Sequence, residues 1–97
     1  MIVHIVMLTF KEENKEANII QIKQMLENLM GVVPSLKSMN VGVNFLEDNR
    51  AMDLSLIATF EGMQGLEAYA VHPEHQKVVT FIKTVTKEAK SVDYTKE

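Results

Sequence analysis

The fold is decided at the start of the chain by the stretch Ile2-Val3-His4-Ile5-Val6-Met7-Leu8-Thr9-Phe10. It is rich in β-branched and aromatic residues, as strands are, and both its even-numbered and its odd-numbered positions are largely apolar. A strand that is apolar on both faces has to be covered on both sides. One layer of helices covers one face, and a chain of 97 residues has no second sheet for the other. The stretch therefore predicts a homodimer that packs sheet against sheet.

The next elements predict a helix and a hairpin. Apolar residues recur at three- and four-residue spacing over residues 15–30, which predicts an amphipathic helix. Gly31 suits a left-handed cap at its end, and Pro34 prevents its continuation. Residues 37–46 and 53–61 alternate apolar and polar side chains, and a polar turn separates them. We expect these two segments to form an antiparallel pair of strands.

The last third of the chain completes the pattern. We predict a short helix over residues 64–71, a second helix over residues 73–89 with His72 as its N-cap, and a last strand over residues 91–95. The order β-α-β-β-α-β is that of the ferredoxin-like fold, an α+β architecture with an antiparallel four-stranded sheet and its helices on one face. We expect residues 1–97 to form a single domain.

The composition excludes several classes of protein. A net charge of -3 and the lack of a basic cluster argue against nucleic-acid binding. The chain has no cysteine, so it has no disulfide, thiolate nucleophile or cysteine-bound metal. The apolar start has no signal-peptide features, and no apolar stretch approaches the roughly 20 residues that span a bilayer. We expect a cytoplasmic protein without membrane contact.

The candidate chemistry lies in Tyr69-Ala70-Val71-His72-Pro73-Glu74-His75. On the predicted helix His75 falls on the apolar side and points toward the sheet, and His4 shares its strand face with Val6 and Leu8. Both rings can therefore reach one cavity, with Tyr69 at its rim. Imidazole is the usual general base, and a phenol can donate a hydrogen bond to a developing oxyanion. Apolar walls suit a small hydrophobic ligand.

Each of these residues also has a structural interpretation. His72 beside Pro73 is most simply a helix cap. His4, Tyr69 and His75 can equally be core residues with satisfied hydrogen bonds. Two histidines three residues apart fall short of the three or four convergent ligands that zinc needs, and no glycine-rich phosphate loop is present. We therefore predict no metal and no cofactor.

Five segments together resemble the stress-responsive α/β-barrel domain (Dabb) family over about residues 2–95. The most specific is Tyr69-x-x-His72-Pro73-x-His75. The others are His4-Ile5-Val6-Met7-Leu8-Thr9-Phe10-Lys11, Val33-Pro34-Ser35-Leu36-Lys37, Thr59-Phe60-Glu61 and Val92-Asp93-Tyr94.

The resemblance implies a ferredoxin-like subunit that forms a dimeric α+β barrel through its sheet face. Most members have no assigned reaction. The first function that the resemblance implies is therefore that of a dimeric stress-responsive protein without an assigned reaction, which binds a small hydrophobic ligand in a small apolar pocket. A plant polyketide cyclase of the family implies instead a cofactor-independent lyase or cyclase with aldol-type chemistry. On this alternative, His75 of this chain corresponds to the base, Tyr69 to the hydrogen-bond donor and His4 to a pocket residue. A related α+β barrel family implies a third alternative, a cofactor-independent monooxygenase.

The same resemblance implies which side chains line the pocket. They are apolar residues of the first strand, the first helix and the third strand: Val6, Leu8, Ile22, Leu26 and Leu56. The plant cyclase has aromatic residues where this chain has Ile22 and Leu26, and many members have a tryptophan where this chain has Val41 before Gly42. The resemblance therefore implies a pocket of a different shape in this chain.

Overall fold

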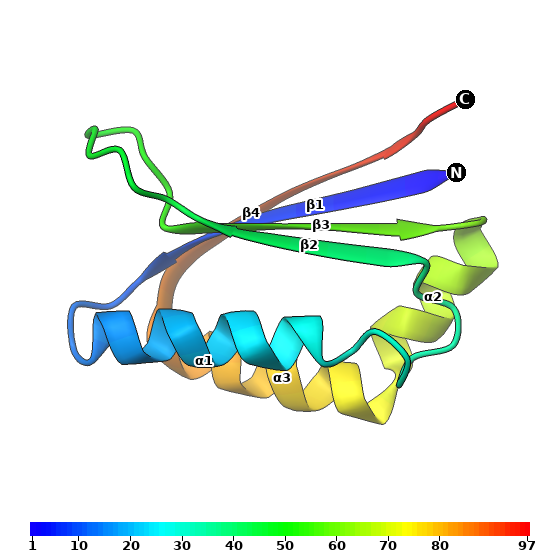
Figure 1. The fold of residues 1–97 in the computed structure, drawn as a ribbon, viewed down its shortest axis with the longest axis horizontal. Coiled ribbons are helices and arrows are strands. Elements are labelled where there is room, and N and C mark those ends of the chain that lie inside the picture. The colour runs from blue at the N-terminus through cyan, green and yellow to red at the C-terminus, as the bar shows by residue number, and fades with distance from the viewer.

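The computed structural model describes residues 1–97 as one sheet covered on one face by helices (Figure 1). Its elements are, in chain order, β1 (Ile2–Phe10), α1 (Lys15–Glu27), β2 (Ser38–Val43), β3 (Leu54–Phe60), α2 (Met63–Val71), α3 (Pro73–Val85) and β4 (Thr86–Thr95). This is the predicted ferredoxin-like order, including the predicted division of the helical region after β3 into two helices. None of the helices is long and apolar enough to cross a membrane.

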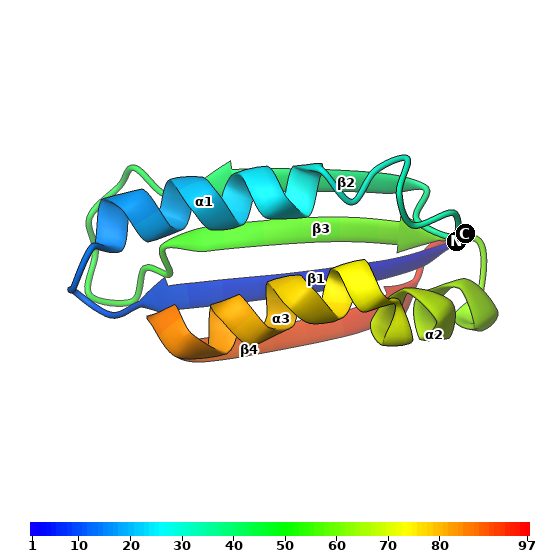
Figure 2. The same cartoon turned by 90° about the horizontal axis from the view of Figure 1, so that it is seen from below.

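The sheet is antiparallel and has the strand order β2-β3-β1-β4. β1 is a central strand that pairs with β3 on one side and with β4 on the other. Its observed bounds are those predicted. The first and last strands of the chain therefore lie side by side, and both termini lie at the same end of the sheet (Figure 2).

The core lies between the sheet and the helices. The even-numbered residues of β1 face the helices, and the cross-strand partners Leu8 and Leu54 are both 1% exposed. Helix α1 contributes Ile22 and Leu26 to the same cluster, while Ile20 points away and is 60% exposed. Ile20 thus lies off the apolar stripe, as its position in the helical pattern predicts.

The end of the chain differs from the prediction. Helix α3 stops at Val85, not near residue 89, and β4 starts at Thr86 and spans ten residues instead of five. Lys87-Glu88-Ala89-Lys90 favours a helix by local propensity. Pairing with the whole length of β1, past an irregularity between Thr9 and Phe10, satisfies the backbone of both strands and overrides that propensity.

The first helix and the two middle strands are shorter than predicted. Helix α1 ends at Glu27, and residues 28–33 continue as tight turns in which Gly31 adopts the predicted left-handed conformation, with φ of 83°. These turns bury Leu29 and Val33 but leave Met30, the last residue of the predicted helix, 43% exposed. Strand β2 ends at Val43, earlier than predicted, and β3 starts at Leu54, because residues 44–53 leave the sheet as a long connection.

The outer face of the sheet has no helices over it. Its central residues are Ile5 and the cross-strand partners Ile57 and Val92 on β3 and β4. Val92 and Tyr94 are 50% and 46% exposed in the single chain. The two-sided apolar character of β1 therefore leaves an uncovered apolar strip on the sheet.

The packing predicts very different costs for two isoleucines on the same helix. Ile22→Ala removes a fully buried side chain and should lower the free energy of unfolding by about 2–5 kcal/mol. Ile20→Ala removes an exposed one and should change it by no more than about 0.5 kcal/mol. Urea unfolding at one protein concentration measures both. Equal losses would contradict the placement of α1.

Candidate functional site

The junction between α2 and α3 brings the motif residues together. His72 has an extended backbone, its Nδ1 accepts a hydrogen bond from the backbone N–H of Glu74 at 3.1 Å, and Pro73 takes the first helical position. His72 is therefore an N-cap, which confirms the prediction. Because proline has no N–H, the chain breaks here and restarts as a separate helix.

Tyr69 and His75 face each other across this break. Their ring centroids are 4.1 Å apart with an interplanar angle of 36°, and the ring of Phe60 lies 5.0 Å from that of Tyr69. Tyr69 is only 2% exposed, and burial raises its pKa to about 12. The phenol therefore stays protonated at neutral pH and can act as a hydrogen-bond donor.

The ring of His75 is oriented by one hydrogen bond. Its Nδ1 lies 3.2 Å from the carbonyl oxygen of Ala70, so Nδ1 carries the proton and donates. Nε2 then holds a lone pair that can accept a proton. Burial lowers the pKa of His75; the bond to Ala70 opposes this shift, and the rings of His4 and His72 add to it. The ring is therefore a neutral base near pH 7.

His4 approaches the same pair from the sheet. It lies on the helix-facing side of β1, and its ring centroid is 6.4 Å from that of Tyr69 in an edge-on arrangement. Its Nδ1 lies 2.5 Å from Oδ1 of Asp93, its cross-strand partner on β4. The structure thus brings His4, Tyr69 and His75 together and adds a carboxylate that orients the His4 ring.

Asp93 is not among the site residues that the sequence predicts. The topology alone indicates where to look for such a residue, because the ferredoxin-like order places the first and last strands next to each other. An acidic residue on the inward-facing side of the last strand then meets a histidine on the first. The sequence does not give the register that pairs His4 with Asp93, since this register depends on how far β4 runs along β1.

The predicted apolar residues lie in the core. Leu8, Ile22, Leu26 and Leu56 are at most 3% exposed, and Val6 is half-buried against the same cluster. None of the five main surface cavities is lined by these five residues or by the three rings. They therefore pack as a continuous apolar layer beside the rings.

The ring cluster is reached from the β4 side. Ala89, Ser91 and Asp93 face the helices, because their cross-strand partners on β1 do, yet all three are exposed. Figure 2 shows β4 extending past α3 on the side away from α1. The Tyr69 hydroxyl bonds to no protein group, and the protein has no buried polar side-chain atom without a partner, so the hydroxyl keeps contact with solvent.

The titratable groups of the site do not form a metal centre. No group of three or more histidine, aspartate or glutamate side chains is close enough to hold a metal ion. Nδ1 of His4 is engaged by Asp93, Nδ1 of His72 by the backbone of Glu74, and Nδ1 of His75 by Ala70. The arrangement is suited to proton transfer and hydrogen bonding.

Comparison with protein families decides where the chain belongs. Residues 2–96 match the model of the Stress responsive A/B Barrel Domain (Dabb). The chain belongs to this family. Among curated proteins it is similar to the olivetolic acid cyclase of Cannabis sativa, with 28% identity over 74 residues, 74% of this chain and 73% of the cyclase.

Solved structures share the fold of this Dabb domain. A dimeric ferredoxin-like protein of unknown function from Jannaschia sp. CCS1 is 26% identical, with a TM-score of 0.83 over 97% of each chain. A hydroxynitrile lyase from Passiflora edulis is 16% identical, with a TM-score of 0.85 over 96% of this chain and 90% of its own. Two further similar structures are also described as dimeric.

The environment of His75 predicts its titration. Its pKa in the folded protein lies below 6.5, so the unfolded chain binds the proton more readily. The free energy of unfolding should therefore fall as the pH drops from about 6.5 toward the lower folded pKa. NMR titration of the His75 ring measures the pKa directly.

A His4→Gln variant supplies the internal comparison. It removes a nearby charge that lowers the pKa of His75, so the titration should move toward higher pH. A His75 ring that titrates above 6.5 in the unmodified chain would contradict the buried placement of the ring.

Proposed function

We propose that this Dabb protein binds a small, largely apolar carbonyl compound beside the rings of His4, Tyr69 and His75. The observation that carries the proposal is the Tyr69–His75 ring pair, which places a protonated phenol and a neutral imidazole 4.1 Å apart at a cluster open to solvent. The exposed inner side of β4 gives a ligand access to this pair. Of the predicted apolar residues, the half-buried Val6 can contact the hydrocarbon part of the ligand, and the buried Leu8, Ile22, Leu26 and Leu56 pack behind it.

The hydrogen bond from Nδ1 of His75 to Ala70, which leaves Nε2 free to accept a proton, favours a second and more specific function. This function is that of a cofactor-independent lyase or cyclase. Nε2 of His75 removes a proton from the carbon next to the carbonyl, and the electron pair moves onto the carbonyl oxygen. The Tyr69 hydroxyl donates a hydrogen bond to the enolate oxygen that forms. The enolate carbon attacks a second carbonyl, and the new alkoxide takes the proton back from His75. The olivetolic acid cyclase and the hydroxynitrile lyase similar to this chain support this class of chemistry.

His4 and Asp93 take a positioning role in this scheme. The carboxylate accepts the Nδ1 proton of His4 as a hydrogen bond and leaves Nε2 free to contact the ligand. The site then offers the Nε2 atoms of two imidazole rings and one phenol hydroxyl to the polar end of a ligand. A β-dicarbonyl compound in its enol form fits this set of groups, because its carbonyl oxygen accepts from the phenol and its O–H donates to an imidazole nitrogen.

The proton-transfer step is testable without the natural substrate. An aryl ketone such as acetophenone is incubated with the protein in D₂O, and exchange of its α-protons is followed by NMR. His75→Gln should reduce the protein-dependent exchange about 100-fold or more, as expected for loss of a general base. Tyr69→Phe should reduce it by a similar factor, through loss of the enolate hydrogen bond.

A matched control lies on the same junction. His72→Asn keeps a capping side chain and removes an imidazole that acts on His75 only through a minor electrostatic effect, so exchange should change far less than in His75→Gln. Ligand-induced NMR shifts at Tyr69 and His75 without any exchange would leave the binding function and reject the reaction. Neither shifts nor exchange with a panel of aryl ketones and β-diketones would reject both.

We also propose that the functional unit is a homodimer joined through the outer sheet face, which would form the α+β barrel. The uncovered apolar strip around Ile5, Ile57 and Val92 supports this, and so do the dimeric relatives. A second sheet of the same chain buries such a strip in an isologous contact.

The sheet-face dimer predicts the effect of one added charge. Val92→Asp places an unpaired carboxylate in the interface and should convert the dimer to monomer at micromolar concentration, while the fold measured by circular dichroism persists. Val32→Asp is the control, since Val32 is 48% exposed and lies in the turns after α1. Sedimentation velocity measures both. A dimer that survives Val92→Asp would contradict this interface.

A further inference from the structure

The connection between β2 and β3, residues 44–53, carries the most exposed aromatic side chain of the molecule. Phe45 is 94% exposed and Leu46 is 66% exposed. Figure 1 shows this segment rising from the sheet on the side opposite the helices. We call residues 44–52 the β2–β3 arm. Phe45 lies near the base of this arm, where it lines one cavity over the outer sheet face and a second one beside Ile19 and Ile20 of α1.

Hydrogen bonds give the arm a defined shape. Asn44 donates its backbone N–H to the carbonyl of Asp53 at 2.9 Å and its side-chain amide to the carbonyl of Leu46 at 2.8 Å. Asp48 accepts the backbone N–H of Arg50 at 2.8 Å through its side chain. The base is tied down as well, because Asp53 accepts the N–H of Phe10 and binds Lys15. The exposure of Phe45 is thus part of an ordered structure.

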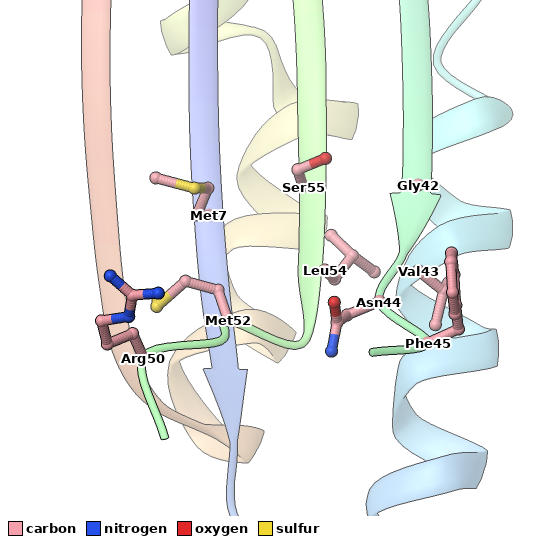
Figure 3. Close-up of a pocket in the computed structure, with 9 residues that line it drawn as sticks. All are labelled: Met7, Gly42, Val43, Asn44, Phe45, Arg50, Met52, Leu54 and Ser55. Atoms are coloured by element: carbon pink, nitrogen blue, oxygen red, sulfur yellow. The ribbon is translucent and has the colours of Figure 1, made fainter. Parts of the chain in front are cut away.

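A cavity of about 440 Å³ separates the arm from the sheet (Figure 3). Met7, Gly42 and Ser55 form its floor on the outer sheet face, and Met52 and Arg50 cross over it from the arm. This cavity is continuous with the apolar strip of the outer face through Met7, which follows Ile5 on the same side of β1. Whatever covers the strip therefore also reaches the cavity and the arm.

We infer that the β2–β3 arm clasps a second copy of this chain. The inference rests on the sheet-face homodimer proposed above and adds a second contact to it. Packed sheets lie about 10 Å apart, so an arm that rises from the outer face extends toward the partner's sheet. Two-fold symmetry makes the contact reciprocal: each arm covers the flank of the other copy, and each cavity receives part of the partner.

The exposed apolar side chains of the arm support a second copy of the chain as the partner that covers them. A large aromatic side chain held in water on a soluble protein marks an interaction site when it adjoins further apolar surface. Phe45 adjoins Leu46 along the chain and Met52 across the cavity. Aromatic and methionine side chains are enriched in interface cores, and an arginine such as Arg50 suits the rim.

The arm is tested first by fluorescence, because the chain contains no tryptophan. In Phe45→Trp the only indole reports on the arm. Its emission should be shifted to shorter wavelength in the dimer and should move to the wavelength of a solvated indole as the protein is diluted to monomer. Val71→Trp is the control, since Val71 is 74% exposed on α2, and its emission should stay solvent-like at all concentrations.

The second test removes the two exposed apolar side chains of the arm. The double variant Phe45→Ser, Leu46→Ser should raise the dimer dissociation constant about tenfold or more in a sedimentation dilution series, while Val71→Ser leaves it unchanged. A dimer whose Phe45→Trp indole stays solvated, with an unchanged dissociation constant in the double variant, overturns the arm and keeps the sheet-face dimer. A chain that is monomeric at every concentration overturns both.

Discussion

The two-sided apolar character of β1 is the constraint on which the rest of the molecule depends. β1 is paired on both edges, by β3 and β4, and it is apolar on both faces. Its inner face recruits α1 and α3 and closes the core around Leu8 and Phe10. Its outer face is left uncovered in the single chain. His4 lies in the middle of this strand, so the position of the imidazole is determined by the most heavily constrained segment of the chain.

The site combines groups that differ in how firmly they are held. Tyr69 is almost wholly buried and packs on Phe60, a residue of β3. His75 depends on a helix start and on one hydrogen bond to Ala70. His4 depends on Asp93 of β4, the edge strand. The scaffold therefore fixes the phenol most rigidly, and the two imidazole rings are set by local contacts around it.

Periodicity and end signals were enough to predict the element order, the bounds of β1, the N-cap at His72 and the left-handed Gly31. These are local properties, since each depends on a few neighbouring residues. The start of β4 at Thr86 was not predictable in this way, because the helical propensity of residues 87–90 is overridden by pairing with β1. The Asp93 contact was missed for the same reason, since a register is a property of two strands. The exposed arm at Phe45 was read as part of a strand, because its alternation continues that of β2.

The helix break at Pro73 has a consequence for how the motif should be compared between proteins. In one uninterrupted helix, residues six apart are separated by about 9 Å along the axis and by about 240° around it, so their rings could not stack. Tyr69 and His75 meet only because the chain turns through an extended His72 between them. Their spacing in the sequence is thus informative only together with the proline that breaks the helix. A related chain that has both residues but lacks the helix break matches the motif in sequence but does not bring the two rings together.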